Sequence, residues 1–204
     1  MNSEERIKAA ARKVFHQKGY AGTRTRDIAE EAGINHAMVN YYFRSKEKLF
    51  GIVMLETMTF FFKGVSTILN NENTSLEQKI EQVVAKYIDL LLEEPELPTF
   101  VFNEVRTNPE PFVENSPIHE ALQNSVLARQ YAEAVAQGRI TEPNLIHTVL
   151  NVISLVIFPF IAQPIFTALS RTDKEAYKTL MLERKKLIPQ WIKAMLFVGE
   201  KSEK

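Results

Sequence analysis

Hydrophobic residues recur at helical spacing along almost the whole chain. In residues 3–19 the apolar positions fall on one face of a helix, and in residues 76–93 they recur at i, i+4, i+7 and i+8. No segment alternates apolar and polar residues as a half-buried strand would, and no internal repeat is present. The pattern therefore predicts an all-α fold.

Helix start and stop signals divide the chain into about nine helices. Ser3 and Ser45 stand where N-caps are expected, Ser75 forms a capping-box pattern with Gln78, and Gly19 is placed to end the first helix. The predicted helices cover, approximately, residues 3–19, 25–32, 36–43, 46–69, 76–93, 97–106, 117–137, 143–162 and 173–198, with a loop at 107–116.

The apolar stretch 145–169 is long enough to be tested as a membrane span. It contains His147, Asn151, Pro159 and Pro164, and it lacks basic flanks and aromatic belts. A proline removes a helical hydrogen bond, so the helix should bend near Pro159. We expect a buried or subunit-interface helix here, and no membrane partner.

The charge distribution separates the chain into two parts. The 204 residues have a formal net charge of zero, yet residues 1–50 hold ten basic and six acidic residues, and the remainder is acidic by the same margin of four. A basic head on an acidic body suggests a polyanionic partner at one end. The alternative is that these charged side chains only contact solvent, which would give the same charge difference. The chain opens without a signal-peptide pattern, so the expected location is the cytoplasm.

The sequence contains no motif typical of an enzyme active site or a metal site. The chain has no cysteine, which excludes disulfides, thiolate metal sites and cysteine nucleophiles. Its four histidines are scattered, and HExxH, GxSxG, P-loop and GxGxxG patterns are all absent. The sequence therefore predicts no catalytic residue, no metal site and no cofactor.

The strongest local signal is the segment TRDIAEEAGINHAMVNYY at residues 25–42. Ala29 permits a close crossing of two short helices, Gly33 permits a positive φ at the turn, and Ile34 closes the corner. This spacing predicts a helix-turn-helix, with an ordinary helical hairpin as the alternative. The residues expected to pack between the two helices are Ile28, Ala32, Val39 and Tyr42.

With its neighbours, this segment resembles the tetracycline-repressor-type family of bacterial regulators. The resemblance covers about residues 4–52 and rests on GY at 19–20, GT at 22–23, DIAEEAGI at 27–34 and YYFRSKEKLF at 41–50. It implies an all-α homodimer with a DNA-binding head at residues 1–46. It also implies a helical ligand-binding and dimerisation body at residues 47–204, and release of operator DNA when ligand binds.

Helix 36–43 would then enter the major groove of operator DNA. Asn40 offers a donor and an acceptor to base edges, and Met38 could touch thymine methyl groups. Both depart from the residues common in the family, a small residue at 38 and Tyr at 40. Tyr42 and Lys46 match family phosphate contacts, although a core tyrosine and a surface lysine are alternatives. The candidate DNA-binding residues are Arg24, Thr25, Arg26, Asn35, His36, Ala37, Met38, Asn40, Tyr41, Tyr42 and Lys46.

The long helix from residue 45 to 69 would join head to body over roughly 37 Å. A ligand that tilts this helix would change the separation of the two heads of a dimer, which must lie about one duplex turn apart. With thirteen phenylalanines in the chain, we expect a largely hydrophobic effector, while ordinary core packing is the alternative for any one ring. The candidate ligand-binding residues are Met58, Phe62, Tyr87, Leu91, Phe102, Glu104, Arg106, Tyr131, Ser154 and Phe158.

Dimerisation is expected to use the last two long helices as a four-helix bundle. The candidate interface residues are Ile153, Ile157, Leu187, Ile188, Trp191 and Met195, with intrachain core as the alternative. The sequence thus predicts a ligand-responsive transcriptional regulator, a repressor that binds a palindromic operator as a dimer and is released by a small effector. The alternative function is a helical small-molecule-binding or protein-interaction module that never touches DNA.

Overall fold

The structure is a computed structural model, and it describes residues 2–95, 97–107, 123–171 and 173–197. Its helices are α1 Ser3–Gly22, α2 Thr25–Ala32, α3 His36–Phe43, α4 Lys46–Leu69, α5 Leu76–Glu93, α6 Leu97–Thr107, α9 Val126–Ala136, α10 Leu145–Ile161, α11 Gln163–Ser170 and α12 Lys174–Leu196. Within these residues there is no β-strand, only an isolated bridge between Ile140 and Phe197. The predicted all-α fold is confirmed.

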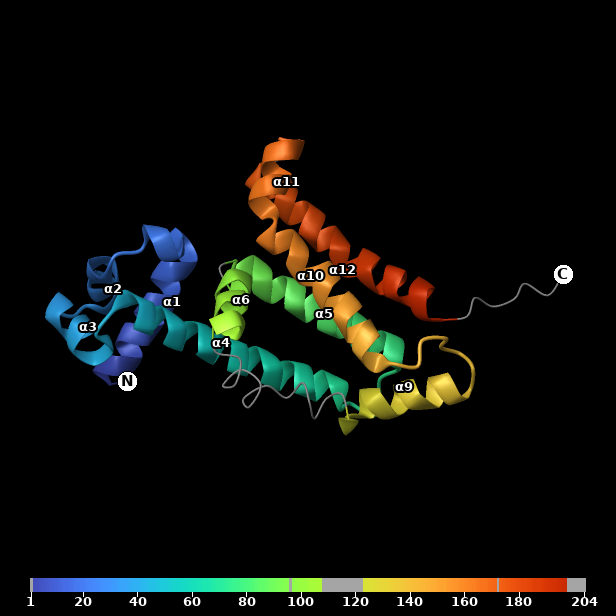
Figure 1. The fold of residues 1–204 in the computed structure, drawn as a ribbon. Coiled ribbons are helices and arrows are strands. Elements are labelled where there is room, and N and C mark those ends of the chain that lie inside the picture. The colour runs from blue at the N-terminus through green and yellow to red at the C-terminus, as the bar shows by residue number, and fades with distance from the viewer. Residues whose placement is uncertain (1, 96, 108–122, 172, 198–204) are drawn as a thin grey trace.

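The helices form two parts joined by α4 (Figure 1). Helices α1–α3 gather at one end, and we call them the head. Helix α4 leaves the head and runs along the helices that follow it, which we call the body. In the body α5 packs against α12 and α10, α9 lies at the far end, and α11 projects outward. This arrangement matches the small head and larger body expected from the sequence.

The predicted N-caps hold for α4 (Ser45) and α5 (Ser75) and fail for α1. Asn2, not Ser3, caps α1: its side chain accepts the Glu5 N–H at 2.8 Å, and the Glu5 carboxylate accepts the Asn2 N–H at 3.3 Å. Ser3 has an arginine three residues later, so it has no carboxylate for this reciprocal pair. The first regular helical stretch does end at Gly19, as predicted: its φ of 67° is not helical, and a second short stretch continues α1 to Gly22.

The predicted helix over 117–137 is shorter among the described residues. Helix α9 begins at Val126, and the Ser125 side chain accepts the Ala128 N–H at 3.1 Å as its N-cap. The loop expected at 107–116 and the start of that helix lie mostly outside the described residues. The described part holds ten helices rather than about nine, because α11 follows α10 as a separate helix.

The bend near Pro159 is confirmed, and α12 stabilises it. Helices α10 and α11 meet at an angle of 63°. Pro159 has no N–H to give to the Leu155 carbonyl, so Arg184 of α12 donates to that oxygen at 2.8 Å. The Tyr177 hydroxyl, also on α12, donates to the Pro159 carbonyl at 2.9 Å. By length and composition alone α4 and the bent pair are apolar enough to cross a membrane, a property that core helices of soluble proteins share.

A row of aromatic rings connects the head to α6. Phe15 and Tyr20 of α1 lie 4.9 Å and 4.8 Å from the Phe50 ring of α4, measured between ring centroids. Phe50 in turn meets Phe100 of α6 edge to face at 5.5 Å. Such contacts stabilise by about 0.5–1.5 kcal/mol each beyond their buried area. The head is therefore linked to α6 through Phe50 of α4.

Candidate functional site

Hydrogen bonds fix the turn between α2 and α3. Gly33 has φ +63°, and its N–H donates to the carbonyls of Ala29 and Glu30. The Ile34 N–H also donates to the Ala29 carbonyl, at 3.0 Å. From α1, Arg6 donates to the Ala32 carbonyl at 2.7 Å. These bonds satisfy the last carbonyls of α2 and hold α3 at a set angle to it.

The interior of the head agrees with the predicted motif except at one residue. Ile28, Ala32 and Val39 are buried, as expected. Tyr42 is not: its side chain is 39% exposed, and Phe43 takes the inner position instead. Phe43 lies four residues after Val39 and so shares its face of α3. The expectation that Tyr42 packs between the helices is therefore wrong, and its ring is available on the surface.

The outer face of α3 is exposed and carries no acidic residue. Tyr41 is 79% exposed and meets the Tyr42 ring edge to face at 5.4 Å between centroids. Met38 is 36% exposed, and Ala37 and Asn40 are exposed beside it. The face thus presents a thioether, a methyl, an amide and two phenols, which suits contacts to base edges and phosphates.

Three of the candidate DNA-binding residues also brace the head. The Thr25 hydroxyl and His36 Nε2 are hydrogen-bonded at 2.8 Å, which ties the start of α2 to the start of α3. The Asn35 side chain caps α3 by accepting the Ala37 N–H at 2.9 Å. Arg24 and Arg26 flank this pair as exposed side chains at the N-terminus of α2. The arginines are thus free of the bracing role and available to phosphate.

Lys46, expected as a phosphate contact, also braces the head. Its ammonium donates to the Tyr20 carbonyl at 3.0 Å and to the Thr23 carbonyl at 3.1 Å, and it lies 4.2 Å from the centre of the Tyr20 ring. The Tyr20 hydroxyl donates to Glu47 at 2.8 Å. Lys46 therefore closes the C-terminal end of α1, where carbonyls lack helical partners.

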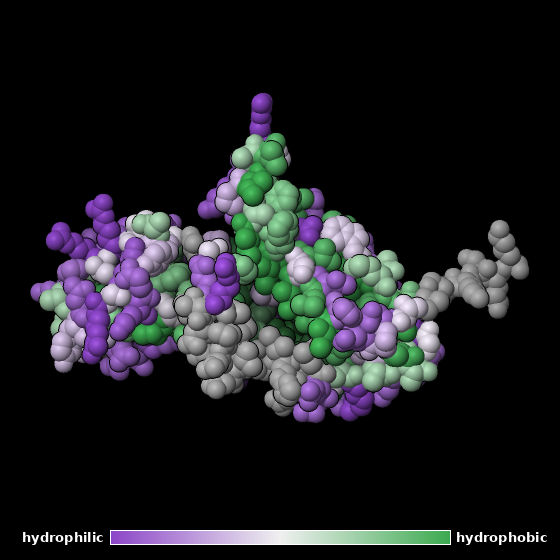
Figure 2. Space-filling view, in the orientation of Figure 1, coloured by the Kyte–Doolittle hydropathy of each residue, from purple (hydrophilic) through white to green (hydrophobic). Residues whose placement is uncertain are grey.

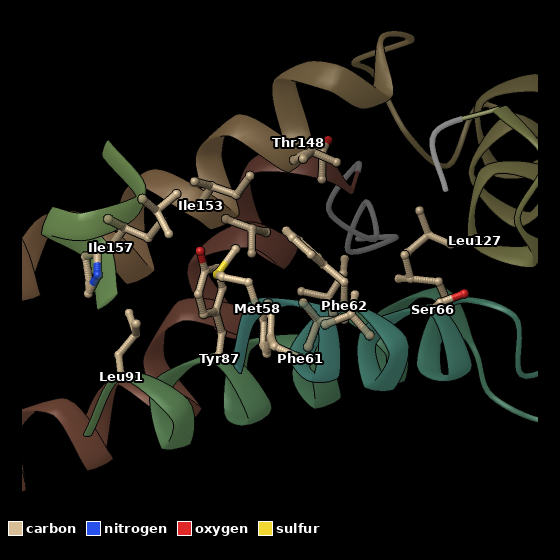
Figure 3. Close-up of a pocket in the computed structure, with 18 of the residues that line it drawn as sticks. Met58, Phe61, Phe62, Ser66, Tyr87, Leu91, Leu127, Thr148, Ile153 and Ile157 are labelled. Atoms are coloured by element: carbon tan, nitrogen blue, oxygen red, sulfur yellow. The ribbon is translucent and has the colours of Figure 1, made fainter. Parts of the chain in front are cut away.

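The body contains a partly open cavity of about 370 Å³. Helices α4, α5, α6, α9 and α10 all contribute to its wall (Figure 3). Nearly all of that wall is aliphatic or aromatic: the described lining residues include no charged side chain. A cavity of this size and character suits an apolar small molecule. Elsewhere in the described chain, no group of three or more His, Asp or Glu residues is arranged to hold a metal ion.

The sequence located part of this cavity. Six candidate ligand-binding residues line it: Met58, Phe62, Tyr87, Leu91, Phe102 and Tyr131. Arg106, Ser154 and Phe158 are exposed on the surface and do not line it, and the Glu104 side chain lies outside the described residues. The missed part of the wall is mostly on α5 and α10, for example Ile80, Val83, Val149 and Val152, which belong to the same apolar stripes that predicted those helices.

Of the candidate dimer-interface residues, some lie inside the protomer and others are exposed. Ile153 and Ile157 line the cavity, and Ile188 is fully buried inside the protomer, so none of these three serves as an exposed interface residue. Helix periodicity identifies an apolar face without saying which apolar surface covers it. Trp191 is 38% exposed and Met195 51%, while Leu187 is half-buried.

A larger exposed apolar surface runs over α10, α11 and α12. Figure 2 shows apolar residues gathered along the projecting part of the body and down over its middle. None of the residues of α11 is buried. The most exposed large apolar residues on these three helices are Leu150, Phe158, Ile165, Leu169 and Met195. A surface of this extent is typical of protein–protein contact.

Comparison with known families identifies the head. Residues 7–52 match the family model described as "Bacterial regulatory proteins, tetR family". Over 98% of its length the chain is 26% identical to a Bacillus subtilis protein named "Probable HTH-type transcriptional regulator YttP", of which it covers 97%. Over half of its length it is 35% identical to the "HTH-type transcriptional repressor NicS" of Pseudomonas putida, covering 48% of that protein.

Solved structures extend the similarity of fold to the body. A transcriptional regulator of the TetR/AcrR family from Thermobifida fusca superposes with a TM-score of 0.65 at 19% identity, covering 91% of this chain and 96% of that one. A bacterial regulatory protein in the tetR family from Rhodococcus RHA1 gives 0.62 at 20% identity, covering 98% and 100%. The whole helical arrangement, head and body, is thus shared.

Proposed function

We propose that the chain is a ligand-responsive repressor of the tetR family of bacterial regulatory proteins, a proposal supported by the family match over residues 7–52 and by the similarity to transcriptional regulators along the whole chain. It binds a palindromic operator as a homodimer and leaves it when a small hydrophobic molecule fills the body cavity. Residues 1–46 form the DNA-binding domain, and residues 47–204 form the domain for ligand binding and dimerisation. Its place of action is the cytoplasm, where bacterial operators lie.

The observation that carries the proposal is the exposed, acid-free face of α3. Met38, Asn40 and Tyr41 stand on this face and would read base edges in the major groove. Tyr42 and the exposed arginine Arg24 would contact phosphates on either side. Each neutralised phosphate adds about −0.9 to the slope of log affinity against log salt, so a dimer should show a steep negative slope.

Dimerisation is supported by the exposed apolar surface on α10–α12. Trp191 and Met195, together with Phe158, Ile165 and Leu169, would bury this surface against a second copy. A palindromic operator requires two heads about 34–36 Å apart, which a two-fold dimer supplies and a monomer does not. Sedimentation at rising protein concentration measures this directly, and a monomer at every concentration contradicts the proposed dimer.

A binding assay with duplex DNA from upstream of the chain's own coding region tests operator recognition. We expect salt-sensitive binding that is much tighter than binding to scrambled DNA. Asn40→Ala should cost about 1–3 kcal/mol at one base pair and relax the preference there. An unchanged ratio of operator to scrambled affinity in Asn40→Ala contradicts base reading by Asn40, and indifference of the wild-type chain to all duplex DNA contradicts the function.

A further inference from the structure

The polar groups in the cavity wall are few, and most are already hydrogen-bonded. Among the described lining residues, polar side chains come only from Ser66, Tyr87, Tyr131 and Thr148, and all four are uncharged. The Tyr131 hydroxyl donates to the Glu142 carbonyl at 2.6 Å and lies 3.0 Å from the Thr148 hydroxyl. Tyr131 and Thr148 thus satisfy each other at one end of the cavity.

Ser66 is also engaged. Its hydroxyl oxygen accepts a hydrogen bond from the Asn70 amide at 3.4 Å, one helical turn further along α4. Of the four polar groups, only the Tyr87 hydroxyl remains without a hydrogen-bond partner in the described part of the chain. The Tyr87 hydroxyl is accessible from the cavity, and a ligand that covers it without pairing it would leave a buried, unpaired hydroxyl at a cost of about 1–3 kcal/mol.

Tyr87 is held so that its hydroxyl faces the cavity. Its ring packs on Phe61 of α4 with centroids 4.6 Å apart. Figure 3 shows the side chain rising from α5 with its oxygen pointing between Met58 and Ile157, toward α10. Burial raises the pKa of Tyr87 well above its ordinary value of 10.0. The hydroxyl therefore keeps its proton at neutral pH and offers an O–H donor to whatever occupies the space.

We propose that the effector is an uncharged, predominantly hydrocarbon molecule with one acceptor oxygen, such as an alcohol, ketone or ester, and that this oxygen receives the Tyr87 O–H. The inference rests on the proposed ligand-binding function of the same cavity. A carboxylate or an ammonium would be buried without an opposite charge in the described wall, at a cost of several kcal/mol. A pure hydrocarbon would leave the Tyr87 hydroxyl unpaired.

The first test measures binding to the full-length chain without DNA, using three probes of equal chain length. 1-Decanol is uncharged, while decanoate and decylamine carry one negative and one positive charge at neutral pH. Calorimetry should give one decanol bound per chain, at least about tenfold tighter than either ion. Affinity should rise about fourfold per added methylene until the cavity is full. Tighter binding of decanoate or of decylamine overturns the proposal.

The second test isolates the hydrogen bond. Tyr87→Phe keeps the ring and removes the hydroxyl, so we expect decanol affinity to fall about 2- to 12-fold. Affinity for hexylbenzene, which has no oxygen, should be preserved. Tyr177→Phe is the matched control: it removes a buried hydroxyl that is already bonded within the protein and does not line the cavity, so its ratio of decanol to hexylbenzene affinity should match the wild type. The same ratio in Tyr87→Phe as in wild type overturns the role of Tyr87.

A third variant separates the cavity from the exposed apolar surface. Val149→Phe fills part of the cavity wall and should abolish decanol binding while the helical circular dichroism is retained. Decanol binding that survives in this variant places the site elsewhere and overturns the inference. The proposed effector class and the proposed regulatory function can be refuted independently. If the chain binds operator DNA but binds decanoate or decylamine more tightly than decanol, only the effector class is refuted. If it binds decanol but no DNA, only the regulatory function is refuted.

Discussion

Replacing Lys46 by methionine distinguishes a bracing residue from a phosphate contact. In the structure the Lys46 ammonium holds the carbonyls of Tyr20 and Thr23 and lies over the Tyr20 ring. Methionine keeps the aliphatic stem and removes all three interactions. The variant should therefore lose stability of the head, whereas loss of a phosphate contact would leave the free protein unchanged.

The size of the effect follows from the contacts. Two hydrogen bonds contribute about 0.5–1.5 kcal/mol each, and a partly exposed cation–π contact adds about 0.5–1 kcal/mol. Lys46 is only half-buried, so water can reach the freed carbonyls and recover part of this sum. We expect a net loss of about 1–2 kcal/mol, which corresponds to a Tm lowered by roughly 2–8 °C for a chain of this size.

Two measurements on the same variant decide the matter. Thermal unfolding reports stability, and operator binding over a range of salt concentrations reports phosphate contacts. Lys48→Met is the control, because Lys48 is exposed one half-turn further along α4 and should change the Tm little. If Lys46→Met keeps the wild-type Tm while its salt slope shrinks by about 1.8 per dimer, the bracing role is refuted and a phosphate contact in each head is indicated.

Three further predictions concern stability. Arg184→Met leaves the Leu155 carbonyl of the bent helix unpaired, so it should lower the free energy of unfolding in urea by about 1–3 kcal/mol. Lys186→Met, at an exposed position, should change it by no more than about 0.5 kcal/mol, and equal effects of the two variants contradict the support of the bend by Arg184. Gly33→Ala forces an alanine into φ +63° and should cost about 1–2 kcal/mol, while Gly22→Ala, which has no positive φ and room for its Cβ, should cost less; the reverse order refutes the strained turn. Burial raises the pKa of Tyr177 from 10.0 to about 12, so its contribution is fully present below pH 10 and is lost as pH rises toward 12. Tyr177→Phe should therefore show a shallower alkaline loss of stability, and an unchanged slope would exclude this tyrosine as a cause.

The head was predictable because its signals are local. Gly33 and Ala29 lie four residues apart, and their roles follow from backbone geometry within one turn. Among the residues expected to pack between the two helices, only the aromatic one is misplaced, since Tyr42 and Phe43 are adjacent and both fall within reach of the face set by Val39. Periodicity resolves a helix face to about one residue, so it could not choose between them.

The helices of the body could be predicted from the sequence, but what each helix face packs against could not. Ile153 and Ile157 occupy the apolar stripe of α10, and a stripe looks the same whether it faces a cavity, a core or a second chain. Lys46 and Arg184 could not be assigned from the sequence for another reason. Their long side chains reach carbonyls 23 to 29 residues away along the chain, and only the folded structure brings these groups together.

Helix α6 has one face toward the head and another toward the cavity. Phe100 touches the aromatic row that includes Phe50, while Val101 and Phe102, the next two residues, line the cavity. A single helical turn cannot be remodelled on one side without moving the other. Under the proposed function, mutations that adapt the wall to a new effector would therefore also disturb the contact between Phe100 and Phe50, which leads to the DNA-binding head.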